Sequence, residues 1–128
     1  MADTLRVLVV DDEGSIRTVL TRWLRDWGYD ATRVANADDA VREMERRPAD
    51  IIFADITMPI HDGIWLLEQV HQRWPKAQVI MESGVQESST VLRAKQFGAV
   101  DFLPKPFGRE MVHQALERAI ARLLTDRI

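Results

Sequence analysis

Acidic, hydroxyl and amine side chains stand at the ends of four predicted strands in this sequence. Asp11 and Asp12 follow the first apolar run, Asp55 ends a later one, Ser83 follows the next, and Lys105 comes after the last. Three carboxylates packed together repel one another, and a divalent cation relieves that repulsion. Ligands that are all oxygen favour a hard cation, of which Mg²⁺ fits best. The implied chemistry is phosphoryl transfer, in which Ser83 can donate a hydrogen bond and Lys105 can neutralise phosphate charge.

Asp55 is the candidate nucleophile. The apolar run Ile51–Ala54 ends on this acid, and Pro59 and Gly63 break the chain soon afterwards. A run of this length between turn residues is typical of a buried strand. Ligands bind at the carboxyl ends of parallel strands, and an aspartate there can itself attack phosphorus. Any one of the five residues alone could be only a helix cap or a turn residue, so the joint pattern is what favours a functional site.

Strands and helices alternate along the chain and must position these residues. Strands are predicted over Leu5–Val10, Tyr29–Ala35, Ile51–Ala54, Ala77–Met81 and Val100–Leu103. Apolar residues at three- and four-residue steps predict a helix after each strand. Five strands alternating with five helices predict an α/β fold, a doubly wound parallel sheet with helices on both faces. The polar second strand fits an edge, and the thin apolar face of the helix over Ser88–Phe97 makes it the weakest element.

Composition bounds the class of protein. The 128 residues include 46% hydrophobic and 29% charged residues, with no repeat or linker, which predicts one globular domain over residues 1–128. The net charge of −3 gives no electrostatic case for direct binding of nucleic acid. The chain has no cysteine, which excludes disulfides and thiolate catalysis. It lacks a signal-peptide pattern and an apolar run long enough to span a membrane, so a cytoplasmic protein is expected.

Several motifs resemble those of the receiver domain of two-component response regulators. They are Val9–Glu13, Asp55–Pro59 with Asp62-Gly63, Ser83-Gly84, and Gly98–Phe107. The resemblance extends over roughly Leu5–Leu124, with the motifs in the right order on the right elements. It implies a flavodoxin-like fold with strand order 2-1-3-4-5. It also implies a protein that takes part in two-component signalling, as a phosphoprotein and a link in a phosphorelay.

The resemblance assigns the metal and phosphate roles. Asp55 would accept a phosphoryl group from the phosphohistidine of a sensor histidine kinase or of a phosphotransfer protein. Asp12, Asp55 and the backbone carbonyl of Thr57 would bind Mg²⁺, and Asp11 would act through a metal-bound water. The chain would then be no enzyme with its own substrate turnover, but a phosphoacceptor that loses its phosphoryl group slowly.

The resemblance also implies a switch. Ser83 and Lys105 would contact the phosphoryl group, and the Lys105–Pro106 peptide bond is expected to be cis. Ser83 would move toward the phosphoryl oxygen, and Phe102 would rotate inward behind it. The face formed by the fourth helix, fifth strand and fifth helix would repack, so homodimerisation on phosphorylation is one open outcome. The downstream effector is not evident from these residues.

Four positions depart from the family pattern or bear on it. Phe102 stands where the family often has tyrosine, so it can pack inward but carries no hydroxyl. Glu82 precedes Ser83 where an apolar residue is usual, and it is costly unless it reaches solvent, is paired or lies near Lys105. Thr57 and Val85 occupy positions that influence how water reaches the phosphoryl group.

Two other functions stay open. A small Mg²⁺-dependent aspartyl phosphohydrolase would also use Asp55 as nucleophile, but it usually needs a second acid two residues on, where this chain has Thr57. A flavin carrier of similar fold would need a loop rich in hydroxyl groups and glycine after the first strand. The chain has Asp11–Gly14 there, and these acids repel phosphate unless a metal intervenes.

Overall fold

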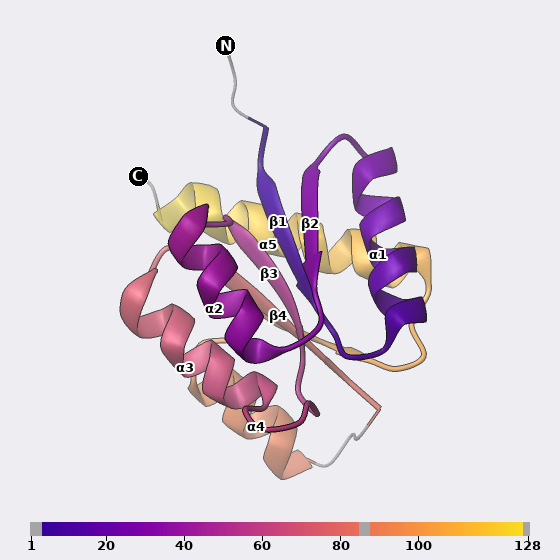
Figure 1. Ribbon diagram of the computed structural model, residues 1–128. Helices are drawn as coiled ribbons and strands as arrows, with labels where there is room; N and C mark the ends of the chain where they lie inside the picture. The colour runs from indigo at the N-terminus through magenta and orange to yellow at the C-terminus, as the bar shows by residue number, and fades with distance from the viewer. Residues whose placement is uncertain (1–3, 85–87, 127–128) are drawn as a thin grey trace.

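A five-stranded parallel sheet forms the centre of the protein. The computed structural model describes residues 4–84 and 88–126, so Val85 lies outside the described residues. The strands are β1 (Arg6–Val10), β2 (Asp30–Val34), β3 (Ile51–Asp55), β4 (Gln78–Ser83) and β5 (Asp101–Pro104). They are ordered β2-β1-β3-β4-β5, and every neighbouring pair is parallel (Figure 1). The predicted fold class, strand order and polar edge strand are all confirmed.

Five helices cover the two faces of the sheet (Figure 1). They are α1 (Gly14–Asp26), α2 (Ala37–Arg46), α3 (Gly63–Arg73), α4 (Ser88–Gln96) and α5 (Arg109–Asp126). Residues of α1 and α5 share one apolar cluster, and residues of α2, α3 and α4 share the other. None of the helices in the described parts of the chain combines the length and apolarity needed to cross a bilayer.

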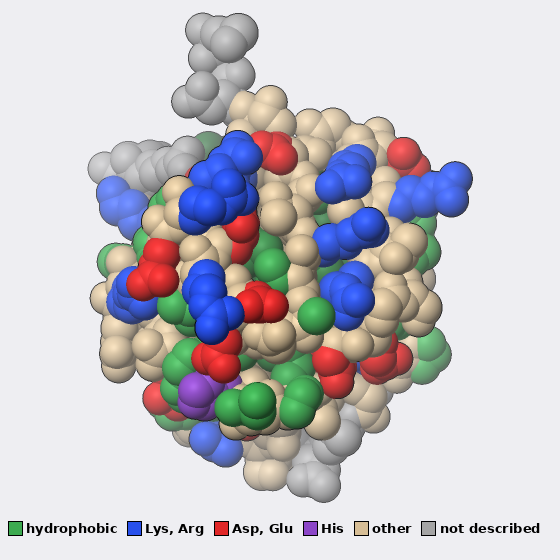
Figure 2. Space-filling model, viewed as in Figure 1, with side chains coloured by type: hydrophobic (Ala, Val, Ile, Leu, Met, Phe, Trp, Pro, Cys, Tyr) green, Lys and Arg blue, Asp and Glu red, His purple; other side chains and the backbone are tan. Residues whose placement is uncertain are grey.

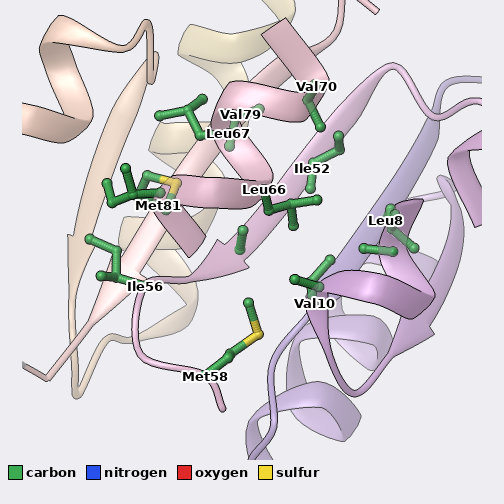
Figure 3. Packing of buried hydrophobic residues seen from close by; sticks show 14 of the residues in the cluster. Leu8, Val10, Ile52, Ile56, Met58, Leu66, Leu67, Val70, Val79 and Met81 are labelled. Carbon is green, nitrogen blue, oxygen red and sulfur yellow. The ribbon is translucent and has the colours of Figure 1, made fainter. Parts of the chain in front are cut away.

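The central strands are buried on both faces because helices pack on each side of them. Every residue of β3 and β4 is buried, as expected for the inner strands of a parallel sheet. Alternate residues point to opposite faces, so Ile52 belongs to the cluster under α3, and Phe53 belongs to the cluster under α1 and α5. Figure 3 shows Leu66 and Val70 of α3 against the first of these faces.

Local sequence signals set several helix ends. The side chain of Asn36 accepts a hydrogen bond from the backbone N–H of Asp39 at 2.8 Å, which confirms it as the N-cap of α2. Asp62 does the same for α3 through the N–H of Trp65 at 2.9 Å. Gly28 follows α1 with φ of +94°, a left-handed conformation that glycine adopts without strain.

Helix α4 is the least anchored helix, as its thin apolar face predicted. Ala94 is the one buried residue of α4, and the side chain of Leu92 is 55% exposed. Val91 and Leu92 instead line a groove of about 390 Å³ together with Phe102 and Pro104 of β5. Helix α4 therefore packs on the sheet with little buried apolar surface, and this packing stabilises the helix only weakly.

Candidate functional site

The predicted acids meet at the carboxyl ends of the strands. Asp11, Asp12, Glu13 and Asp55 each offer an oxygen atom, and these atoms all lie within 4.8 Å of one another. Three of these acids, together with Thr57, Gly84 and Lys105, line a depression of about 300 Å³. Strand order explains why these acids lie close together, because β1 lies beside β3 and both strands end at the same edge. The sequence prediction of an acidic cluster at this edge is confirmed in its position.

Asp11 is buried and firmly held. Its Oδ1 accepts a hydrogen bond from the N–H of Glu13 at 2.8 Å, and its backbone carbonyl accepts one from Arg17 at 2.7 Å. Asp12, the next residue, is exposed. The two neighbouring acids therefore differ in character, since Asp11 is fixed by the fold while Asp12 faces the depression and solvent.

Asp55 lies at the bottom of this arrangement, and only 3% of its surface is exposed. Its Oδ1 accepts a hydrogen bond from the N–H of Thr57 at 3.1 Å, and its Oδ2 accepts one from Lys105 at 3.1 Å. Burial, and next the charge of Asp11, raise the pKa of Asp55 to about 6, against the lowering effect of Lys105. Near neutral pH the carboxylate is therefore ionised, as a nucleophile must be.

Lys105 is the positive charge that the acids share. Its Nζ lies 3.0 Å from Asp11 Oδ2, 3.0 Å from Glu13 Oε1 and 3.1 Å from Asp55 Oδ2. Burial by itself lowers the pKa of Lys105, but the bonds to Asp11, Glu13 and Asp55 outweigh it and raise that pKa. The ammonium group is thus kept charged, in place to meet a phosphate oxygen. The predicted cis Lys105–Pro106 bond is confirmed.

Glu13 belongs to the site, although the sequence alone gave it no role there. It stands at the N-cap position of α1 but makes no capping hydrogen bond with its side chain. That side chain instead reaches Lys105. No local pattern could reveal this contact, because it joins residues 92 positions apart.

The side chain of Glu82 does not reach solvent. It is fully buried, and no protein donor within the described residues reaches either of its oxygen atoms. Its polar contact is the carboxyl group of Asp11. Burial first, and then Asp11, raise the pKa of Glu82 well above its ordinary value. Burial and the neighbouring carboxyl group of Asp11 thus both favour the protonated form of Glu82.

Asp11 is the other half of this carboxyl pair. Burial by itself raises its pKa, but the neighbouring Glu82, the hydrogen bond from the N–H of Glu13 and the charge of Lys105 outweigh burial and lower it. The 3.0 Å contact between its Oδ2 and Lys105 is an ion pair that lacks hydrogen-bond geometry. Of the three ways in which Glu82 could be tolerated, solvent exposure is excluded by its full burial, and its charge is influenced by both Asp11 and Lys105.

Ser83 and Phe102 lie on neighbouring strands but in different surroundings. Ser83 is the last residue of β4 and is buried, and its carbonyl accepts a hydrogen bond from the N–H of Lys105 at 2.8 Å. Phe102 is half-buried and lines the groove beneath α4. Phe102 of β5 thus lies at the groove, and Lys105, the residue that follows β5, lies at the site, three residues further along the chain.

The loop from β3 to α3 is shaped by close packing. A Cβ atom on Gly63 would meet the backbone carbonyl of Asp55 and would lie 2.7 Å from the Cα of Ile56. Only glycine lets α3 start this close to the strand that carries Asp55. Nδ1 of His61, within the loop, is 2.9 Å from Asp38 Oδ1 of α2, a link that no sequence pattern indicated.

The donor set fits a hard divalent cation. The four clustered acids supply oxygen ligands only, which suit Mg²⁺. Thr57 lines the depression beside them, and its backbone carbonyl stays a predicted ligand. The acids outnumber the one lysine that joins them, and a cation of two charges would redress that imbalance.

Comparison with known proteins identifies the family. The model of the response regulator receiver domain matches residues 7–117. The chain is 38% identical over 115 residues to the DNA-binding transcriptional regulator NtrC of Salmonella typhimurium, covering 90% of this chain and 24% of that protein. It is 37% identical over 116 residues to the chemotaxis protein CheY of Listeria monocytogenes, covering 90% of this chain and 98% of that protein. It thus spans about a quarter of the length of the NtrC relatives.

Solved structures agree with the sequence relatives. The crystal structure of NtrX from Brucella abortus matches 98% of this chain and 28% of its own, with a TM-score of 0.91 at 31% identity. The structure of the receiver domain of that NtrX covers 90% of this chain and 98% of its own, with a TM-score of 0.85 at 33% identity. The strand order, the acidic edge and these matches together place the chain in the response regulator receiver domain family of two-component signalling systems.

Proposed function

We propose that Asp55 is the phosphoacceptor of this receiver domain. The observation that carries the proposal is its ionised carboxylate at the strand edge, with Oδ2 3.1 Å from Lys105. Asp55 would attack the phosphorus of a phosphohistidine on a sensor histidine kinase or phosphotransfer protein. The new O–P bond gives an acyl phosphate, the P–N bond breaks, and the departing imidazole keeps the nitrogen electron pair and takes up a proton.

The neighbouring residues support this step by position and charge. Lys105 would neutralise a phosphoryl oxygen, and Ser83 would donate a hydrogen bond to another. Asp12, Asp55 and the carbonyl of Thr57 would hold Mg²⁺, with Asp11 acting through water. The bound Mg²⁺ would supply charge neutralisation for the phosphoryl oxygens. Loss of the phosphoryl group by hydrolysis is expected to be slow.

The response to phosphorylation would be transmitted through the side of the sheet where α4 packs, because that helix is weakly anchored. Ser83 and Phe102 would change position on phosphorylation, and the α4–β5–α5 face would repack and bind a downstream effector or a second copy of the chain. The groove of about 390 Å³ beneath α4 supports this, because it gives Phe102 room next to the helix. We also propose that residues 1–128 form a single receiver domain acting in the cytoplasm.

The partners are expected to be proteins. In Figure 2, acidic and basic side chains lie side by side on the face that is shown. Ion pairs such as Arg42–Asp39 and Arg46–Glu43 join charges of opposite sign along α2. This mixed surface supports the expectation of no direct contact with nucleic acid. The phosphohydrolase alternative gains no support from the relatives, which are named as a DNA-binding transcriptional regulator and a chemotaxis protein.

The substitution Asp55→Asn tests the assignment. Incubation with a small phosphodonor and Mg²⁺ is expected to add one phosphoryl group to the parent chain and none to the variant, as measured by intact mass. Asp62→Asn is the matched control, because Asp62 lies in the same loop but caps α3, and asparagine also caps well. That variant is expected to be labelled like the parent. Undiminished labelling of Asp55→Asn would remove Asp55 from this role.

A further inference from the structure

Three carboxylate groups surround the ammonium group of Lys105. Its Nζ lies 3.0 Å from Asp11 Oδ2, 3.0 Å from Glu13 Oε1 and 3.1 Å from Asp55 Oδ2, and the lysine side chain is only 12% exposed. An ammonium group has three N–H donors and no acceptor. A phosphoryl oxygen therefore reaches Nζ most readily where one of the three carboxylates moves away.

The three carboxylates differ in how firmly the fold holds them. Asp11 and Asp55 are buried, and Oδ1 of each accepts a hydrogen bond from a backbone N–H, at 2.8 Å and 3.1 Å. The side chain of Glu13 is 57% exposed, and among the described residues its hydrogen bonds and ion pairs lead only to Lys105. Water can replace that partner for Glu13, whereas a buried aspartate would lose its partner without replacement. Glu13 is thus the carboxylate that can leave Lys105 at low cost.

The needs of the fold do not explain the side chain of Glu13. It stands at the N-cap of α1 but makes no capping hydrogen bond, and shorter polar side chains cap helices better. Its ion pair adds little stability, because more than half of the side chain is exposed to water. What the contact does do is occupy the exposed side of the Lys105 ammonium group, next to the depression that Glu13, Asp55 and Lys105 line together.

We propose that Glu13 is a positioning residue of the phosphoryl site, which holds Lys105 beside Asp55 while no phosphoryl group is bound and gives up its place to a phosphoryl oxygen. The exchange breaks no covalent bond, since Nζ keeps its protons and one hydrogen bond passes from the carboxylate to the phosphoryl oxygen. Glu13 therefore competes with the phosphoryl group and lowers the affinity of the site for it. The inference rests on the phosphoacceptor site proposed above and adds a competitor within it.

Two substitutions at Glu13 separate competition from net charge. Glutamine keeps the length but loses the charge, whereas aspartate keeps the charge but is one methylene shorter, which draws its carboxylate back from Lys105. Both changes give up the ion pair, so Glu13→Gln and Glu13→Asp are each expected to bind the beryllium trifluoride anion, an analogue of the phosphoryl group, about 3-fold more tightly than the parent chain. Titration calorimetry on the full chain at saturating Mg²⁺ measures the affinities.

Two further variants serve as controls. Asp26→Asn removes one formal charge at the other end of α1, outside the acidic cluster, and is expected to leave the affinity for the anion unchanged. Asp55→Asn is expected to abolish binding, because the anion then lacks the carboxylate that it must contact. Thermal unfolding of each variant checks that it is folded.

The direction of the change decides the outcome. Tighter binding by both Glu13 variants would support competition, since damage to the site can only weaken binding. Unchanged or weaker binding by both would overturn the inference, and so would tighter binding by Glu13→Gln alone, which would show an effect of net charge. Absence of binding by the parent chain, or full binding by Asp55→Asn, would instead remove the phosphoacceptor site itself, which distinguishes the two failures.

Discussion

The acidic edge and the α4 side differ in how tightly they are built. At the edge, β3 and β4 are buried throughout, and Lys105 contacts three acids at 3.0 to 3.1 Å. On the α4 side, Ala94 is the one buried residue of the helix, and a groove separates the helix from Phe102. Chemistry needs groups held in place, whereas a response needs an element that can shift at low cost. The fold places the firmly held groups and the weakly anchored helix at adjacent parts of one sheet.

The largest expected contrast lies in truncations of the two regions. Ile80→Ala in β4 removes a fully buried side chain and is expected to lower the free energy of unfolding by about 4 kcal/mol. Leu92→Ala in α4 is expected to change it by less than about 0.5 kcal/mol, because that side chain is 55% exposed. Urea denaturation of the two variants measures both values. Equal losses would show that α4 is as firmly packed as the sheet.

A smaller but still large effect is expected at Gly63. Alanine there would press a Cβ atom against the carbonyl of Asp55 and the Cα of Ile56, so Gly63→Ala is expected to destabilise the fold by about 3 kcal/mol. Gly108→Ala is the matched control, since a Cβ atom there would meet nothing within 4 Å. If urea denaturation gives the two variants the same stability, the loop does not hold Asp55 by close packing.

The smallest expected effect is the pH dependence that Asp55 gives to stability without divalent cations. Its pKa is about 6 in the folded chain and 3.8 ordinarily, so the folded state binds this proton more tightly. The stabilisation is present at low pH and is lost as pH rises through 6. Between pH 5 and pH 7 the parent chain is therefore expected to lose about 1 kcal/mol more than Asp55→Asn.

Other groups of the site do not reverse this sign. Glu82 also has a raised pKa and acts in the same direction, while the lowered pKa of Asp11 acts only below its ordinary value of 3.8. Urea denaturation at pH 5, 6 and 7 in the presence of a chelator measures the difference between the parent and Asp55→Asn. Parallel pH profiles for the two would contradict the raised pKa of Asp55.

The elements of the fold were predictable because their signals are local. Alternating apolar runs and helical stripes predicted all ten elements in order, and Asn36 and Gly28 are residue types that commonly stand at helix ends, as they do here. Boundaries shifted by one or two residues. Strand β4 continues through Glu82 to Ser83, because its pairing with β3 and β5 extends beyond the apolar run.

The composition of the site was only partly predictable. Asp11, Asp12, Asp55 and Lys105 could be placed together because residues that follow parallel strands meet at one edge. The surroundings of Glu13 and Glu82 could not be read from sequence, since each depends on a neighbour from a distant strand. Glu13 is part of an acidic motif whose members the sequence does not distinguish, and Glu82 is predicted only to be costly when buried.

The sequence by itself determined which residues end the strands and which faces of the helices are apolar, because periodicity and turn chemistry act within a few residues. Only the tertiary structure decided how the charges pair. Strand order brings Lys105 to Asp11 and Glu13, 94 and 92 residues away in the chain, and burial raises the pKa of Glu82. Those choices depend on distances and exposure that exist only once the sheet is assembled.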